Sequence, residues 1–161
     1  MRLLLFVLGL SFLLLFSACS NVDLIATDSK TIQEHLSNYK GEKAVLLNVW
    51  ATTCAPCVEE FPMIVDLGKE IHDLEIVFVS ADFDDNINEV IDFLYDHHVS
   101  RISYIKNEKD QPFINGIHST WTGSLPFTIL FGKNSGEIVS YWEGKEQESK
   151  FRKHIQLAIN E

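Results

Sequence analysis

Two cysteines, Cys54 and Cys57, stand three positions apart in the segment NVWATTCAPCVEEFP. A pair at this spacing can exchange with a partner's disulfide, supply half of a metal site, or form a structural bridge. The chain has one other cysteine, Cys19, close to its N-terminus. Thiol chemistry in the body of the chain therefore depends on this one pair.

The elements around the pair favour redox chemistry. The apolar run 44–50 predicts a buried strand, and a helix is expected to start around Cys54 and to run to about Ile71. At a helix start, unpaired backbone N–H groups and the positive end of the helix dipole stabilise a thiolate, the attacking species in thiol exchange. We therefore expect Cys54 to be the nucleophile. Cys57, one turn further on and more buried, would close the disulfide and release the partner, and Pro56 suits an early helical position.

Residues 1–18 have the pattern of a secretory signal. Arg2 precedes an apolar run over 3–16, which is shorter than the roughly 20 residues of a comfortable membrane span. Small residues then lead to Cys19, as before a cleavage site. The segment resembles the lipobox of bacterial lipoproteins, although Phe16 stands where Leu is usual.

The lipobox resemblance implies cleavage before Cys19 and a lipid on its sulfur. Residues 19–30 would then be a tether between a bacterial membrane and a domain over 31–161. Two other interpretations stay open: an uncleaved anchor helix, and an ordinary signal followed by a spare cysteine. All three place the domain outside the cytoplasm.

The rest of the chain alternates strands and helices. The predicted elements after the tether are a helix within 31–41, the strand 44–50, the helix from Cys54, a strand at 75–80, an amphipathic helix at 86–97, a strand within 101–106, a short helix or turn at 110–118, an antiparallel hairpin over 125–144 and a helix within 146–161. This order predicts an α/β sandwich with helices on both faces of a sheet.

Several segments together resemble the thioredoxin superfamily. They are VLLNVWATTCAPC, Pro62 five residues after Cys57, TGSLPFTILF with its Pro126, and FGKNSGEIV. The resemblance implies a three-layer α/β/α sandwich with a mixed central sheet. The stretch from Cys57 to Pro126 is longer than in plain thioredoxins, which indicates an insertion after the second core strand, holding the helix at 86–97 and the strand after it.

Asn48 stands where thioredoxins carry a buried Asp. Together with the pattern CxPCxxEFP, the insertion and the membrane signal, it resembles the TlpA/ResA-like branch. That resemblance implies an extracytoplasmic thiol-disulfide oxidoreductase without a cofactor, which reduces disulfide-bearing proteins such as apocytochrome c. Its electrons would come from a membrane thiol donor of the DsbD/CcdA type.

Four further residues are predicted to serve this site. Glu60 is the expected proton carrier, because a carboxylate among apolar residues has a raised pKa and exchanges protons near neutral pH. Pro126 is expected to follow a cis peptide bond, leaving the backbone of Leu125 free to pair with a substrate strand. Trp50 is expected beside the cysteines, on the substrate-binding surface.

Composition limits the other functions. A net charge of −10 and a pI near 5.0 argue against a nucleic-acid partner, which would require a basic face. Zinc sites need four ligands, and the single CxxC supplies two, so no metal is predicted. A thioredoxin-like copper chaperone and a non-catalytic lipoprotein stay open as alternatives. Ala55-Pro56 resembles the Gly-Pro of reducing members, which favours a reductase.

Overall fold

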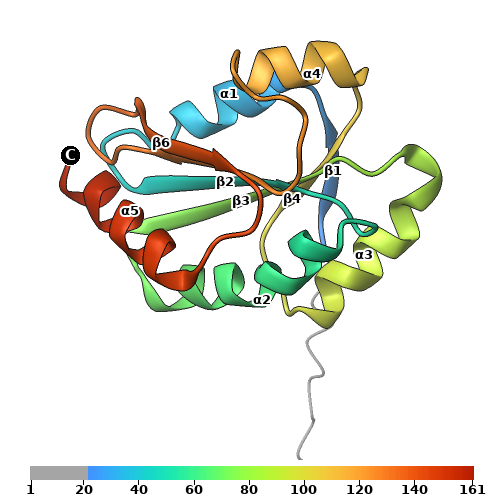
Figure 1. Cartoon of the computed structure of the whole chain (residues 1–161), viewed down its shortest axis with the longest axis horizontal. Coiled ribbons are helices and arrows are strands. Elements are labelled where there is room, and N and C mark those ends of the chain that lie inside the picture. Colours follow the sequence, from blue (N-terminus) through green and yellow to red (C-terminus); the bar gives the residue numbers. More distant parts are fainter. Residues whose placement is uncertain (1–21) are drawn as a thin grey trace, which may run out of the picture.

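The computed structural model describes residues 22–161, which form one mixed six-stranded sheet between two layers of helices (Figure 1). The elements in chain order are β1 (Leu24–Thr27), α1 (Ser29–Ser37), β2 (Ala44–Trp50), α2 (Ala55–Glu70), β3 (Leu74–Ser80), η1 (Asp84–Asn86), α3 (Ile87–Asp96), β4 (Ser103–Lys106), α4 (Asp110–Ile117), β5 (Phe127–Phe131), β6 (Ile138–Glu143) and α5 (Glu148–Asn160). The predicted α/β/α sandwich is confirmed, and α3 and β4 are the insertion expected after the second core strand.

The sheet has the strand order β1-β4-β3-β2-β5-β6. The first four strands in this order run parallel, β5 is antiparallel to β2, and β6 is antiparallel to β5. β2 lies at the centre and is buried along its whole length, as its unbroken apolar sequence predicts. The C-terminal ends of β2 and β3 lie side by side at one end of these central strands, where the chain leaves β2 for the cysteines.

Each face of the sheet has its own apolar core. α2, α3 and α5 cover one face, and α1 and α4 cover the other (Figure 1). Phe61 of α2 lies at the centre of the first core, with its ring 4.1 Å from that of Phe78 on β3. The two cores hold β2 and the start of α2 in a fixed relation, because close-packed side chains leave little room for movement.

The side chain of Asp28 determines where α1 begins. The carboxylate of Asp28 accepts a hydrogen bond of 2.7 Å from the backbone N–H of Thr31, so Asp28 is the N-cap and the helix begins at Ser29. Ile32 and Leu36 then lie four positions apart on the buried side of the helix.

The predicted tether over 19–30 is wrong for its second half. Leu24–Thr27 forms β1, which pairs in parallel with β4 at the edge of the sheet, and α1 follows at once. A four-residue edge strand carries too few positions for a periodic pattern to be visible in the sequence. The predicted signal peptide and Cys19 lie outside the described residues. Among the helices of residues 22–161, none has both the length and the apolar character needed to cross a bilayer.

Candidate active site

Cys54 and Cys57 form a disulfide at the N-terminus of α2, with their Cα atoms 5.2 Å apart. Cys54 is the N-cap residue and is partly exposed, whereas Cys57 exposes 1% of its surface. The carbonyl of Cys54 accepts the first helical hydrogen bond, 3.0 Å long, from Val58. In the reduced protein, Cys54 would therefore be the accessible sulfur at the positive end of the helix, and Cys57 the shielded one.

Glu60 lies one helical turn beyond Cys57 and exposes only 2% of its surface. Its carboxylate accepts a hydrogen bond of 3.2 Å from the backbone N–H of Glu146 and a longer one of 3.4 Å from the amide of Asn48. Burial raises the pKa of Glu60 to about 7, against the opposing effect of these two hydrogen bonds and of the nearby Lys145 charge. The carboxyl group can therefore take up and release a proton near neutral pH.

Asn48 connects the carboxylate to the sheet. Its amide nitrogen also donates a hydrogen bond of 3.1 Å to the hydroxyl of Thr128, a fully buried residue of β5. Thr128 and the backbone of Glu146 were not predicted from the sequence, because both lie more than 75 residues from their partners in the chain. The available signal for Thr128 was its place as the single polar residue in the apolar strand β5.

The Leu125–Pro126 peptide bond is cis, as predicted. Phe127, the first residue of β5, pairs with Val49 near the end of β2. The cis bond therefore lies at the same end of the central strands as the loop that leads to Cys54. Pro126 is buried, and Leu125 is partly exposed.

The surface position predicted for Trp50 is wrong. Its side chain is fully buried and packs with ring centroids 4.8 Å from Phe61 and 4.7 Å from Phe93. Phe93 belongs to α3, the inserted helix, and the position of this helix over Trp50 could not be read from the local sequence. Trp50 supports the start of α2 from within the core.

A buried carboxylate holds the loop before Cys54. Asp82, just after β3, accepts hydrogen bonds from the backbone N–H of Thr52 at 2.9 Å and from its hydroxyl at 2.7 Å. The hydroxyl of Ser80 donates a third, also 2.7 Å long. Asp82 is 4% exposed and ties the cysteine loop to β3. This role was not predicted from the sequence, since an Asp after a strand is common in loops.

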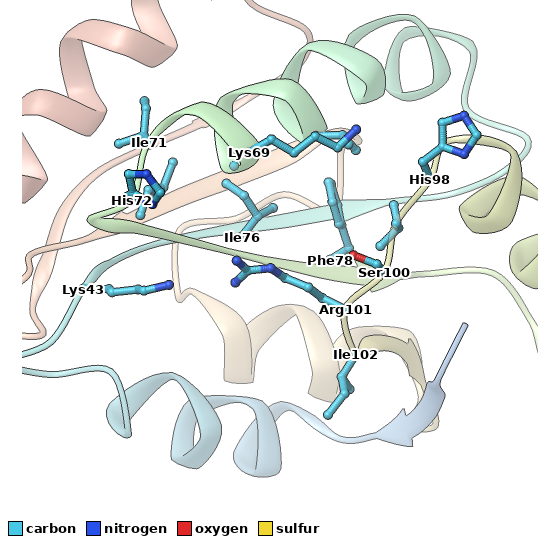
Figure 2. Close-up of a pocket in the computed structure, with 14 residues that line it drawn as sticks. Lys43, Lys69, Ile71, His72, Ile76, Phe78, His98, Ser100, Arg101 and Ile102 are labelled. Carbon is cyan, nitrogen blue, oxygen red and sulfur yellow. The ribbon is translucent and has the colours of Figure 1, made fainter. Parts of the chain in front are cut away.

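A hollow of about 320 Å³ lies where α2 ends and β3 begins, away from the start of α2 (Figure 2). Lys43 and Arg101 line it, and Figure 2 shows their charged ends pointing toward one another. Both bind the carboxylate of Glu75, Lys43 at 3.0 Å, so their charges are compensated within the protein. None of the predicted site residues lines this hollow. In the part of the chain that the structure describes, no three His, Cys, Asp or Glu side chains gather as a metal site would require.

The AhpC/TSA family matches residues 19–152, which is most of the sequence. The chain belongs to this family. It is similar to the thiol-disulfide oxidoreductase ResA of Geobacillus kaustophilus, with 28% identity over 139 residues that cover 83% of this chain and 73% of the relative. ResA of Bacillus subtilis is 26% identical over 141 residues, or 88% and 74% of the two chains.

Solved structures have the same fold. A thioredoxin-related protein of Neisseria meningitidis serogroup B superposes with a TM-score of 0.63 and 25% identity over 78% of this chain and 91% of that chain. A thiol:disulfide interchange protein of Chlorobium tepidum gives a TM-score of 0.63 and 19% identity over 76% and 83%. The predicted resemblance to the TlpA/ResA-like branch is confirmed by the ResA relatives, and these relatives together with the Cys54–Cys57 pair identify the chain as a thiol-disulfide oxidoreductase.

Proposed function

We propose that this AhpC/TSA family member reduces disulfides of proteins outside the cytoplasm, apocytochrome c among them, through Cys54 and Cys57. The observation that carries the proposal is the arrangement of the pair: one partly exposed and one buried sulfur at a helix N-terminus, with a buried carboxyl group one turn away. The Ala55-Pro56 dipeptide, which resembles that of reducing members, supports this direction of electron flow.

Cys54 begins the reaction in the reduced protein. Its thiolate attacks one sulfur of the substrate disulfide, so that a mixed disulfide forms and the other substrate sulfur leaves as a thiolate that takes a proton from water. Cys57 then loses its proton and attacks Cys54 Sγ. The second substrate sulfur leaves, the Cys54–Cys57 disulfide closes, and two electrons have passed to the substrate.

Glu60 would carry the proton of the second step. Cys57 is shielded from bulk water, so its proton needs an acceptor within the protein, and Glu60 lies one turn away on the same buried side of α2. With a pKa of about 7, the carboxylate accepts the proton from Cys57 and returns it to the departing substrate sulfur. The backbone at the cis bond before Pro126 would hold the substrate strand, through the free peptide groups of Leu125.

The N-terminal sequence and the resemblance to the TlpA/ResA-like branch support a proposal for the location and the electron donor. We propose that Cys19 carries a lipid that anchors the domain to the outer side of a bacterial membrane. A membrane thiol donor of the DsbD/CcdA type would reduce the Cys54–Cys57 disulfide after each turnover by the reverse of the same exchange.

Insulin reduction tests the activity. The chain without residues 1–18 and with Cys19→Ser should precipitate insulin in the presence of dithiothreitol, and Cys54→Ser should abolish this. Cys57→Ser should accumulate mixed disulfides through Cys54, which non-reducing gels and mass spectrometry would reveal. A Cys54–Cys57 pair that does not reduce insulin would favour the non-catalytic lipoprotein alternative. If that inactive protein binds copper tightly and stoichiometrically, the copper chaperone alternative would be favoured.

The direction of electron flow needs a separate measurement. Equilibration with glutathione buffers gives the reduction potential of the Cys54–Cys57 pair. A value near that of thioredoxin, about −270 mV, supports a reductase, and a value near about −120 mV would make the protein an oxidant.

A further inference from the structure

Apolar side chains gather on the surface along the β1 edge of the sheet. Ile25, Ile87 and Ile102 expose 45, 38 and 46% of their surfaces there. They line a shallow hollow of about 460 Å³ between β1, α3 and the start of β4. We call this the β1-edge patch, which comprises Val22, Leu24, Ile25, Ile87, Ile91 and Ile102. Isolated exposed isoleucines need no explanation, but a contiguous group marks an interaction surface.

The described chain begins inside this patch. Val22 lines the hollow, and Figure 1 shows the chain reaching the sheet through β1, close to α3. Cys19 is three residues earlier, and three residues span at most about 11 Å when fully extended. A domain of this size has a radius of gyration of about 14 Å. An anchor at Cys19 therefore keeps the β1-edge patch beside the bilayer, however the domain tilts.

The charges beside the patch select the kind of membrane surface. Asp23 lines the same hollow, and Asp92 on α3 is next in sequence to Ile91 of the patch. Arg101, next in sequence to Ile102, is bound to the carboxylate of Glu75, which compensates its charge. The carboxylates of Asp23 and Asp92 would be repelled by anionic lipid headgroups and tolerated by zwitterionic ones. The apolar side chains among them suit the boundary between headgroups and acyl chains.

We propose that the β1-edge patch is a membrane-contacting face that inserts its isoleucines into the interface of a zwitterionic phospholipid bilayer. This inference rests on the proposed anchoring at Cys19. It fixes the orientation of the domain, since β1 and β6 are the opposite edges of the sheet. The β6 edge then points away from the bilayer, into the space where substrate proteins diffuse.

Depth-dependent fluorescence quenching tests the orientation. The full-length protein, with Cys54→Ser and Cys57→Ser, is purified as made by a bacterium and placed in phosphatidylcholine nanodiscs that contain acyl-chain quencher lipids. An environment-sensitive probe is attached at Ile25→Cys, at Ile102→Cys or at Tyr141→Cys. Tyr141 on β6 is the matched control, because it is 46% exposed, as Ile102 is.

We expect the lipids to quench the probes at positions 25 and 102 at least threefold more strongly than the probe at 141. Equal quenching at all three positions would overturn the proposal. Exchange of half the phosphatidylcholine for phosphatidylglycerol should reduce quenching at 25 and 102, and stronger quenching would overturn the choice of a zwitterionic surface. Protection of these two probes that depends on protein concentration, without lipid quenching, would identify a second copy of the chain as the occupant and refute membrane contact.

The intact mass of the same sample separates this inference from the proposed anchor. A mass that includes the acyl chains on Cys19, combined with equal quenching, refutes only the membrane-contacting face. A mass without the acyl chains refutes the lipid anchor. If that mass includes an uncleaved leader, the leader would still hold residue 22 at the membrane, and the quenching measurement would still test the membrane-contacting face. A protein that is neither lipidated nor incorporated into the discs refutes both.

Discussion

Replacement of Glu60 by Gln tests the central electrostatic feature of the site. Glutamine keeps the size of the side chain and an oxygen that can accept the hydrogen bond from the Glu146 N–H, but it has no charge at any pH. The wild-type carboxyl group is buried and has its pKa raised to about 7, so its ionisation works against the folded state. Glu60→Gln should therefore remove a pH dependence of stability without removing the packing.

The size of the effect follows from the two pKa values. A glutamate exposed to water, as in the unfolded chain, has a pKa of 4.5, whereas the pKa of Glu60 in the folded protein is about 7, so the folded state binds more protons between these values. The free energy of unfolding of the wild type must therefore fall as the pH rises through this window. Linkage gives a loss of about 2.5 kcal/mol between pH 5 and pH 8. We expect the measured loss of unfolding free energy to be about 1 to 2.5 kcal/mol, because water that enters beside the ionised carboxylate reduces the cost of its burial.

Urea unfolding of the oxidised protein at several pH values between 5 and 8 measures this difference. The wild type and Glu60→Gln should have similar stability at pH 5, and the variant should be more stable by the stated amount at pH 8. Glu59→Gln is the matched control, because it removes an adjacent carboxyl group that is exposed and leaves the buried one in place. Parallel curves for the wild type and Glu60→Gln would refute the raised pKa and, with it, the proposed proton carrier.

Three other substitutions test the support of the site and the fold. Asp82→Ala should lower the free energy of unfolding by about 1–3 kcal/mol and slow insulin reduction, because the N–H and hydroxyl of Thr52 lose their acceptor; unchanged kinetics would show that the cysteine loop is held by other contacts. Gly68→Ala should destabilise by about 1–3 kcal/mol in denaturant, since its Cβ would lie 2.6 Å from Ile76 Cγ1, and it should cost less in an Ile76→Ala background, which lacks that atom. Asp28→Ala should cost about 1 kcal/mol by removing the N-cap, whereas Asp28→Asn should retain most of the stability.

The strong local patterns predicted most of the fold. The unbroken apolar run of β2 and the helical spacing of α3 each follow from burial on a fixed face, so the sequence alone indicates them. β1 escaped detection because it is an edge strand of four residues whose pairing partner, β4, lies nearly 80 residues further along the chain.

The site was predictable where its residues are neighbours in sequence. Cys54, Cys57 and Glu60 share one helix, so their spacing alone places the two cysteines and the acid within two turns. Trp50 was assigned to the surface because nothing near it in the sequence indicates that Phe93 covers it. The acceptor formed by Asp82 could not be predicted, since side-chain hydrogen bonds between distant loops leave no periodic pattern.

The short span of the Cys54–Cys57 disulfide has a consequence for the unfolded chain. A crosslink stabilises a protein mainly by reducing the entropy of the unfolded state, and this effect grows with the length of the closed loop. A loop of about four residues gives about 2 kcal/mol on this account, against about 4.7 kcal/mol for a loop of 100 residues. Two apolar cores on opposite faces of the sheet hold the fold whether the bond is present or absent. The bond can thus open and close in each catalytic cycle without taking the domain through an unfolding transition.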